Sequence, residues 1–348
     1  MTPRLPPSVP HSLLVLVLPI LLVASSCSGG DGAEDTSTST STSTSRPGSS
    51  EPAPDPTAPG TSSGPAALFE SVCDATATIE DVGRLESPEI TEASGLSGSW
   101  VNEEAWWVHN DSGDAARIFL VAGDGTQLAT VALDGAEARD WESIAVGPGA
   151  APDRAVVYVG DTGDNAVMRD PAGGRGSIRV YRFEEPEIDL SAAPTETSAQ
   201  VDTLTFEFPG GAHDVEALLI DPLDGDLVVV TKDWQRTGAA QVFRGDADAA
   251  PGSTTPLEQV GQVPLEPGTL VTAADVTTDG ALVALRSYGA VHLYLRPAGE
   301  PLWAAFETAP CEGPVPTELQ GESLGFALDG ASYLTVSEGE HAALHRTS

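Results

Sequence analysis

A short pattern recurs along the chain, in which a polar residue precedes apolar residues at every second position. It begins at five places: Glu92 (EASGLS), Glu142 (ESIAVG), Glu216 (EALLID), Thr272 (TAADVT) and Glu322 (ESLGFA). Alternation with a period of two predicts a strand with one buried face. The five starts are 50, 74, 56 and 50 residues apart, and a recurring spacing near 50 residues predicts a repeat architecture.

Each of these segments is followed by further apolar stretches that we expect to be strands. Second strands begin at Ala105, Val156, Leu227, Ala281 and Ser332. Third strands are expected at residues 118–122, 178–183, 240–244 and 291–295, and fourth strands at 127–133, 203–208, 257–263 and 302–308. Four strands within about 50 residues are typical of one blade of a β-propeller.

The fifth unit reaches the end of the chain at Ser348 after only three strands. We expect residues 76–85 to supply the missing one, so that the start of the domain closes the ring. The sequence therefore predicts an all-β fold over residues 66–348: a five-bladed β-propeller with four-stranded antiparallel blades. Two packed sheets are the alternative, but a sandwich does not account for the 50-residue period.

The residues before this domain predict export. Residues 1–26 have a positive Arg4 and an apolar run from Leu13 to Ala24 that is too short to span a membrane comfortably, which is typical of a signal peptide. The sequence VASSC resembles a bacterial lipobox, in which the cysteine, here Cys27, is lipidated. We therefore expect a protein anchored by lipid on the extracytoplasmic face of the cell membrane. Ordinary signal cleavage near Ser26, giving a secreted protein, is the alternative.

Residues 27–65 predict a disordered linker. They contain the run STSTSTSTS and then a stretch rich in Pro, Gly and Asp, with almost no apolar side chains to offset the entropy of ordering. The linker would hold the folded domain away from the membrane.

The charge of the chain narrows the range of partners. It has 16 Lys and Arg against 52 Asp and Glu, a net charge of −36, and Lys232 is its single lysine. Binding to nucleic acid or to an anionic membrane surface needs clustered positive charge, so neither is expected. An acidic surface collects cations and repels copies of itself, and we expect a monomer.

The propeller geometry predicts a metal site. The first strand of each blade lines the central channel, so Glu92, Glu142, Glu216, Thr272 and Glu322 would form a ring at one end of it. Ionised carboxylates that face one another are costly unless they protonate, are solvated or share a cation. Oxygen ligands without Cys or His favour Ca²⁺ over zinc. A water-filled channel without an ion is the alternative.

The second strands end at the same face, and their exits predict a ligand-binding rim. Two exits carry the pattern D-[ST]-G-D, from Asp111 to Asp114 and from Asp161 to Asp164, each 19 residues after its ring glutamate. Such residues are also typical of tight turns. Further rim residues expected beside them are His109, Asn110 and Asn165.

The other three exits carry Lys232, Arg286 and Glu338. A lysine and an arginine beside a bound cation suit a phosphorylated ligand. The alternative is that both pair with neighbouring carboxylates.

These repeats resemble the secreted five-bladed propellers of the calcium-activated nucleotidase (apyrase) family, and are similar in style to phytase-like and esterase-like propellers. The resemblance implies Ca²⁺ in a channel lined by Glu and Ser, and phosphates approached by Lys232 and Arg286. The chain departs from that family after blade three, where Lys232-Asp233 stands in place of paired arginines. This departure argues against hydrolysis, but it does not affect the expected Ca²⁺ site.

Two classes of function remain. The first is a binding module that holds a small molecule, phosphorylated or not, or a protein partner on a metal-stabilised face. The second is a Ca²⁺-dependent extracellular phosphoester hydrolase. We favour the first, because no general base stands out and a fold does not dictate function.

Two cysteines remain in the folded domain, Cys73 and Cys311. In an exported protein a disulfide is the default expectation. The pair can form only if residues 66–74 run along blade four before the closing strand begins.

Overall fold

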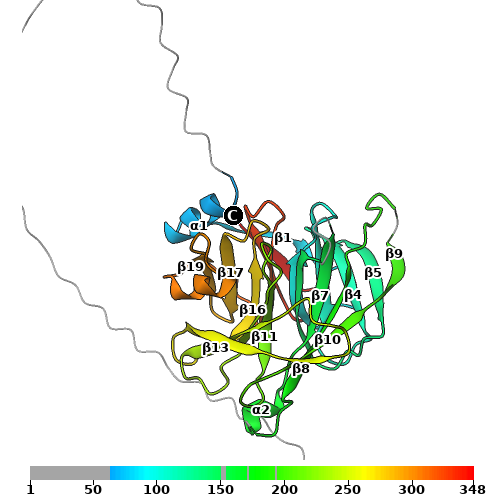
Figure 1. Cartoon of the computed structure of the whole chain (residues 1–348). Coiled ribbons are helices and arrows are strands. Elements are labelled where there is room, and N and C mark those ends of the chain that lie inside the picture. The colour runs from blue at the N-terminus through cyan, green and yellow to red at the C-terminus, as the bar shows by residue number, and fades with distance from the viewer. Residues whose placement is uncertain (1–62, 150–153, 171, 193) are drawn as a thin grey trace, which may run out of the picture. The chain divides into compact units, whose positions relative to one another are not determined.

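The computed structural model describes residues 63–149, 154–170, 172–192 and 194–348 (Figure 1). The predicted signal peptide, the expected lipidation of Cys27 and nearly all of the predicted linker fall outside the described residues. Within the described part, the strands form five sheets, and no helix there is both long and apolar enough to cross a membrane.

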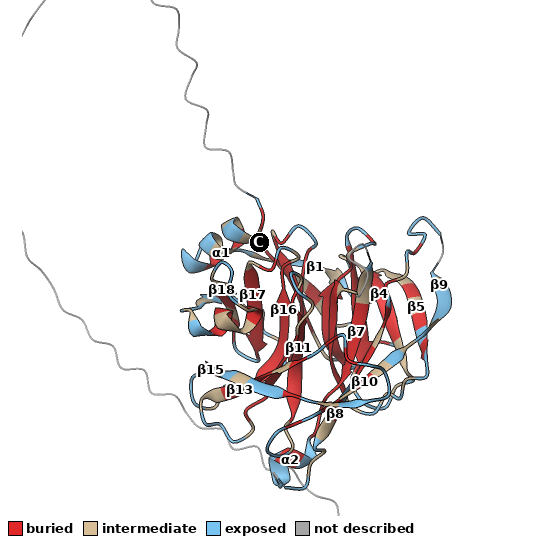
Figure 2. Cartoon of the chain, in the orientation of Figure 1, coloured by how far each residue is buried: buried red, intermediate tan, exposed pale blue. Residues whose placement is uncertain are grey.

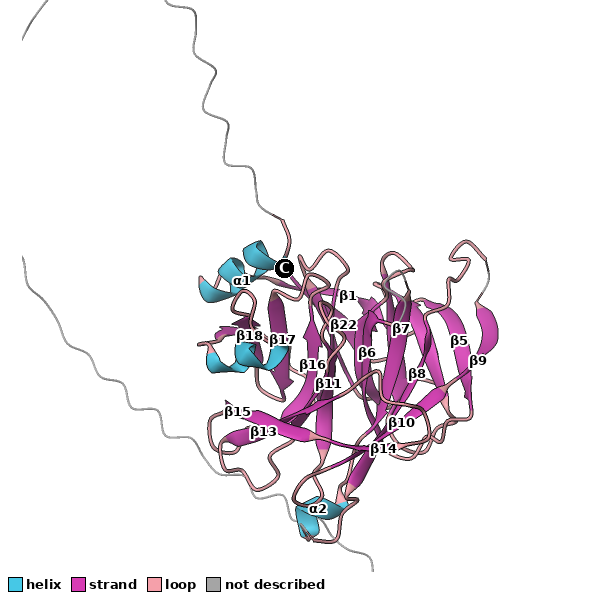
Figure 3. Cartoon of the chain, in the orientation of Figure 1, coloured by secondary structure: helices cyan, strands magenta, loops and turns pink. Residues whose placement is uncertain are grey.

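The five sheets are the blades of a propeller, and Figure 3 shows that strands make up most of the described chain. Blade one contains β2 (Ala93–Gly98), β3 (Ala105–Asn110), β4 (Arg117–Ala122) and β5 (Gln127–Asp134). Blade two contains β6 (Trp141–Pro148), β7 (Ala155–Asp161), β8 (Ser177–Glu184) and β10 (Asp202–Glu207). Blade three contains β11 (Val215–Ile220), β12 (Leu227–Thr231), β13 (Ala239–Gly245) and β15 (Glu258–Pro264). Blade four contains β16 (Val271–Val276), β17 (Leu282–Ser287), β18 (Val291–Leu295) and β19 (Cys311–Gly313). Blade five contains β20 (Gly321–Phe326), β21 (Tyr333–Ser337), β22 (Ala343–Thr347) and β1 (Ile79–Arg84).

The inner strands β2, β6, β11, β16 and β20 contact one another in chain order, and β20 contacts β2, so the ring is closed. These strands are buried along almost their whole length, as Figure 2 shows for β11 and β16. The apolar core consists of five clusters, each built from two adjacent blades. Because every blade is apolar on both faces, it is stable only between two neighbours. The predicted five-bladed propeller is confirmed.

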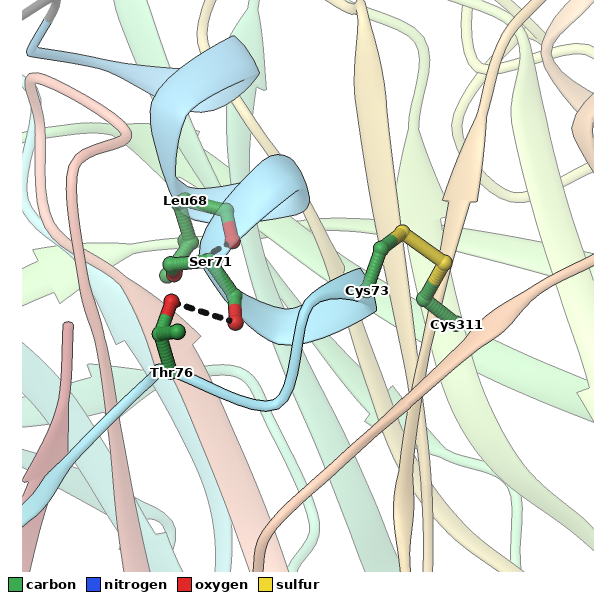
Figure 4. Close-up of a disulfide and its surroundings, with 5 residues drawn as sticks. All are labelled: Leu68, Ser71, Cys73, Thr76 and Cys311. Carbon is green, nitrogen blue, oxygen red and sulfur yellow. Dashed lines mark hydrogen bonds between the residues drawn. A yellow bond between two sulfur atoms is a disulfide. The ribbon is translucent and has the colours of Figure 1, made fainter. Parts of the chain in front are cut away.

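The start of the domain closes blade five, as predicted. Strand β1 pairs antiparallel with β22 and forms the outer edge of the blade, with Ile79 opposite Thr347. The helix before it, α1 (Pro65–Cys73), contacts the strands of blade four. Its last residue, Cys73, forms a disulfide with Cys311 on β19, with the Cα atoms 5.0 Å apart (Figure 4). The chain therefore runs along blade four before it enters blade five.

The expected fourth strand of blade four, at residues 302–308, is wrong. These residues form a 3₁₀ helix, η1 (Leu302–Glu307), and the outer strand is the short β19. Leu302, Ala305 and Phe306 are the buried residues of η1. Their spacing of three and four places them on one face of a helix, whereas it would divide them between the two faces of a strand.

Two short strands that the pattern does not predict extend the outer edges of blades one and two. Strand β9 (Thr195–Gln200) pairs parallel with β5, and β14 (Thr254–Pro256) pairs parallel with β10. Each comes from the chain of the following blade and is largely exposed. By covering an edge, each strand removes a row of unpaired backbone groups. The short helix α2 (Ala166–Arg169) lies in the connection between β7 and β8.

Candidate metal centre at the channel mouth

Every inner strand contains one bulged residue near its start. The register with the second strand shifts at the same place in all five blades, and the bulged residues are Ser94, Glu142, Glu216, Thr272 and Glu322. A bulge bends the strand and redirects the side chain. Four of the five predicted ring residues occupy this position. The fifth is corrected: in blade one the position belongs to Ser94, and Glu92 lies two residues earlier and is exposed.

Two further positions per blade surround the bulge. One lies two residues before it, and the other directly follows the second strand. In blades one, two, three and five the backbone N–H of the second donates to the carbonyl of the first, as from Asp111 to Glu92 at 2.8 Å and from Lys232 to Asp214 at 3.0 Å. The positions before the bulge are occupied by Glu92, Asp140, Asp214, Leu270 and Gln320, and the exit positions by Asp111, Thr162, Lys232, Tyr288 and Glu338. We call these ten residues and the five bulged residues the mouth.

This register also corrects the proposed repeat of D-[ST]-G-D. Asp111 is equivalent to Thr162, because the backbone N–H of Thr162 donates to the Asp140 carbonyl at 3.1 Å. Asp161 is instead equivalent to Asn110, which pairs with Ala93 as Asp161 pairs with Trp141. Equivalent positions of the two motifs are therefore offset by one residue relative to the strands, and they do not place equivalent residues in the mouth.

Two carboxylate triads share Glu142. In the inner triad of Glu142, Asp214 and Glu216, one oxygen of each residue lies within 4.8 Å of the others, and all three residues are buried. In the outer triad of Asp111, Asp140 and Glu142, the same criterion holds and two of the residues are partly exposed. Ser94 Oγ donates to Glu142 Oε2 at 3.0 Å, which joins blade one to the shared carboxylate.

Lys232 extends into the mouth and neutralises part of its charge. Its Nζ donates to Glu216 Oε1 at 2.7 Å and lies 3.8 Å from Glu322 Oε1. The rings of Trp234 and Tyr288 lie 5.1 and 5.8 Å from the ammonium, and the Tyr288 hydroxyl donates to Glu322. One ammonium does not balance the surrounding carboxylates, because a buried charge needs a partner of its own.

The carboxylate oxygen Glu216 Oε2 is buried and lacks a hydrogen-bond partner among the described residues. Glu216 is 1% exposed, and this oxygen has no hydrogen-bond partner among the described residues, while the other oxygen accepts from Lys232. Such atoms are rare in folded proteins and call for an explanation, of which an ion is one. The oxygen belongs to a residue of the inner triad, so a cation bound there can satisfy it.

Burial and mutual repulsion raise the pKa values of the mouth carboxyls. Burial, and then the charge of Glu216, raises the pKa of Glu142 well above its usual value. Burial likewise raises the pKa of Glu216. Burial and Asp140 raise the pKa of Asp111 to about 6, and burial with a hydrogen bond to Glu322 raises that of Glu338 to about 8. Without a cation the mouth therefore retains protons near neutral pH.

Several residues expected at the rim have partners elsewhere. His109 is fully buried, with its ring 5.8 Å from that of Trp141, and burial lowers its pKa to about 4. Asn110 Oδ1 accepts from the backbone N–H groups of Thr91 and Glu92 at 2.9 and 3.1 Å. Asp114 forms an ion pair with Arg117 at 2.9 Å. The side chains of these three residues are therefore engaged by partners inside the protein.

The corresponding residues of blade two are held by Arg175. Its guanidinium pairs with the buried Asp161 at 2.8 Å, and its backbone N–H donates to Asp164. Asn165 is exposed at the start of α2. The sequence analysis did not identify Arg175, since Arg154 and Arg169 both lie nearer to the two aspartates in the sequence.

Arg286 lies between blades four and five. It is 1% exposed, and its guanidinium donates to Glu318 and to the Ser323 carbonyl. Glu318 also contacts His345 Nδ1, at 3.1 Å. The guanidinium is thus occupied by partners inside the protein, which matches the alternative considered from the sequence.

Asp140 and Asp214 are the main site residues that the sequence analysis missed. Each precedes its ring glutamate by two residues, in Asp140-Trp141-Glu142 and in Asp214-Val215-Glu216. This repeated D-x-E was a usable signal, because residues two apart in a strand lie on the same face. No protein-family model matches the chain, and no curated protein matches its sequence.

Proposed function

We propose that the mouth binds Ca²⁺ and that the propeller is a ligand-binding module, exported and tethered by lipid on Cys27 to the extracytoplasmic face of the cell membrane. The observation that carries the metal is the buried, unpartnered Glu216 Oε2 within the inner triad. An all-oxygen set of donors suits Ca²⁺ better than zinc or copper.

The residues of the mouth fit such an ion. Ca²⁺ takes 6–8 oxygen ligands, and the inner triad offers three carboxylates, leaving room for water or for oxygens of a ligand. The Lys232 ammonium neutralises part of the charge of the mouth carboxylates. The negative charge that remains suits one divalent cation better than several. The partly exposed Asp111 and Asp140 would form the side of the site that a ligand approaches.

The Cys73–Cys311 disulfide supports the export part of the proposal, since disulfides persist mainly in oxidising compartments. Lipid anchoring is tested by Cys27→Ala, which should move the protein from the membrane fraction to the medium. Retention of the variant in the membrane fraction would contradict the role of Cys27.

Phosphoester hydrolysis draws less support. Arg286 is buried and occupied by Glu318, and Lys232 is paired with Glu216. Neither cation is free to neutralise a transferring phosphoryl group. Turnover of nucleotides or p-nitrophenyl phosphate that depends on Ca²⁺ and is lost on chelation would reverse this ranking.

Calorimetric titration of the purified chain with Ca²⁺ tests the metal site. We expect saturable binding with a dissociation constant between roughly 10⁻⁶ and 10⁻³ M, and its loss in Glu142→Gln and Asp214→Asn. Glu258→Gln is the control, because it removes an exposed carboxylate on β15, away from the mouth. Absence of binding at millimolar Ca²⁺, or equal binding by all the variants, would refute the site.

A further inference from the structure

Blade four is the one uncharged sector of the mouth. At its three mouth positions it carries Leu270, Thr272 and Tyr288, whereas each of the other blades carries at least two carboxylates there. Blade four itself contributes no carboxylate and no cation at these positions. The sector therefore differs in chemistry from the rest of the ring.

A groove of about 1000 Å³ opens on this sector. Its inner end is formed by Leu270 and Tyr288, and its outer end by Pro310 and Glu312 beside the edge strand β19. We call it the blade-four groove. It follows the blade outward across four strands, which at a spacing of about 4.8 Å is roughly 14 Å. Its volume lies at the upper end of the range for small-molecule sites, and its length suits an elongated ligand.

Tyr288 provides a fixed aromatic surface in this groove. It is 39% exposed and is the sole aromatic among the large apolar side chains exposed in the described residues. Its hydroxyl donates to Glu322 and the Lys232 ammonium lies over the ring at 5.8 Å, so the ring is anchored and one face at most is open to a ligand. An anchored ring loses little entropy when a flat, apolar face packs on it.

The polar lining favours an uncharged partner. Glu266 and Glu312 are exposed carboxylates, and Arg236 is the single guanidinium of the lining. Burial lowers the pKa of His292, which keeps that imidazole neutral at neutral pH. Since the groove has no excess of positive charge and opens beside an acidic mouth, an anionic ligand is disfavoured. Side chains of this kind both donate and accept, which suits hydroxyl groups.

One loop connects the groove to the metal centre. Residues 232–238 carry Lys232 into the mouth and Arg236 into the groove. Asp233 and Arg236 have positive φ values of 57° and 55°, a conformation that is costly for residues other than glycine. The Asp233 carboxylate holds the loop by accepting from Thr237 Oγ1 and from the Gly238 backbone N–H, both at 2.9 Å. Such maintained strain is typical of functional loops.

We propose that the blade-four groove binds a neutral oligosaccharide, with a sugar ring packed on Tyr288 and hydroxyl oxygens directed to the cation at the mouth. A saccharide has an apolar ring face and many uncharged oxygens, which match the aromatic surface and the vacant ligand positions of Ca²⁺. The part that concerns the cation rests on the proposed function. The packing on Tyr288 does not.

The test is titration with neutral hexasaccharides of glucose (α-1,4 and β-1,4), N-acetylglucosamine, mannose and xylose, followed by calorimetry and saturation-transfer NMR in Ca²⁺ and in chelator. We expect one of them to bind, about tenfold more weakly in Tyr288→Ala, and with most of the affinity retained in Tyr288→Phe, which keeps the ring. Leu223→Ala is the control, because Leu223 is 64% exposed in the turn between β11 and β12, at the opposite end of blade three. It should bind as the unmodified chain does.

The outcomes separate the two proposals. If Ca²⁺ binds but no hexasaccharide binds at millimolar concentration, the inference fails and the metal site stands. If a hexasaccharide binds in a Tyr288-dependent way without any binding of Ca²⁺, the groove stands and the proposed metal site fails. Binding that Tyr288→Ala leaves unchanged overturns the assignment to this groove.

Discussion

Replacing Glu142 with Gln should stabilise the metal-free protein and abolish its response to Ca²⁺. Glu142 belongs to both triads, is 3% exposed and forms no ion pair among the described residues. Its one hydrogen-bond donor is Ser94 Oγ, and the carbonyl oxygen of a glutamine can accept this hydrogen bond equally well. The substitution therefore removes a negative charge and leaves the Ser94 hydroxyl with a hydrogen-bond acceptor.

The magnitude follows from the distances in the two triads. Oxygens of Glu142 lie within 4.8 Å of those of Glu216 and Asp111. At this separation two ionised carboxylates repel each other by about 3–4 kcal/mol at an effective dielectric constant of about 20. The raised pKa values of these carboxyls mean that protonation relieves part of this repulsion near pH 7. We expect a net gain of about 1–3 kcal/mol, or a rise in melting temperature of about 2–10 °C.

Differential scanning calorimetry in chelator and in Ca²⁺ measures both effects. The unmodified chain should gain about 2.7 kcal/mol when Ca²⁺ is present at 100 times its dissociation constant, and Glu142→Gln should gain nothing. Glu185→Gln is the matched control: its buried carboxylate accepts from Ser99 Oγ at 2.5 Å and Trp107 Nε1 at 2.7 Å. An amide there brings a donor toward donors, so this variant should melt lower in both conditions.

Two results would refute this reasoning. A lower melting temperature for Glu142→Gln in chelator would show that the mouth carboxylates do not repel one another in the folded state. An equal Ca²⁺-induced increase in both proteins would show that the ion binds without Glu142.

Three further predictions concern the scaffold. Replacing Cys73 and Cys311 with Ser opens a loop of 238 residues. The chain-entropy model then gives a decrease of about 5 kcal/mol in the free energy of unfolding measured in urea, and unchanged stability would contradict it. Arg296→Ala leaves Asp221 buried without its two guanidinium hydrogen bonds of 2.7 and 2.8 Å, and should cost about 3–5 kcal/mol, part of it recovered when Asp221 is also replaced. Burial raises the pKa of Asp275 from 3.8 to about 7. Because the folded state then binds this proton more tightly, the stabilisation is complete below pH 4 and is lost as the pH rises through 7; Asp275→Asn should flatten the fall in stability between pH 5 and pH 8, and an unchanged slope would contradict the assignment.

The number of blades and the closing strand could be predicted because they follow from local alternation and from a period. The register of blade one could not. Moving a strand by two residues leaves a period-two pattern unchanged, so Glu92 and Ser94 fit the alternation equally well. The choice between them is made by the bulge opposite His109 and Asn110, which is a property of the pairing of two strands.

The remaining differences come from contacts that are distant in sequence. The sequence predicts Arg286 at the exit of the second strand, but it lies within β17, two residues before the exit position Tyr288. Its guanidinium direction depends on Glu318, which lies in an irregular segment 32 residues further on. Strands β9 and β14 pair in parallel with a neighbouring blade, and their exposed, polar sequences carry no apolar pattern. Residues 302–308 are apolar enough for a strand, and their helical spacing is too short to be decisive.

The order of Cys73 and β1 along the chain has a mechanical consequence. Any tension applied from the N-terminal side reaches α1 first and then the disulfide, which passes it covalently into β19 of blade four. The hydrogen bonds between β1 and β22, which complete blade five, begin only at Ile79, beyond that cross-link. The disulfide therefore acts as a strain relief: a domain pulled from its N-terminal side would tilt as a rigid body, and the ring would stay closed.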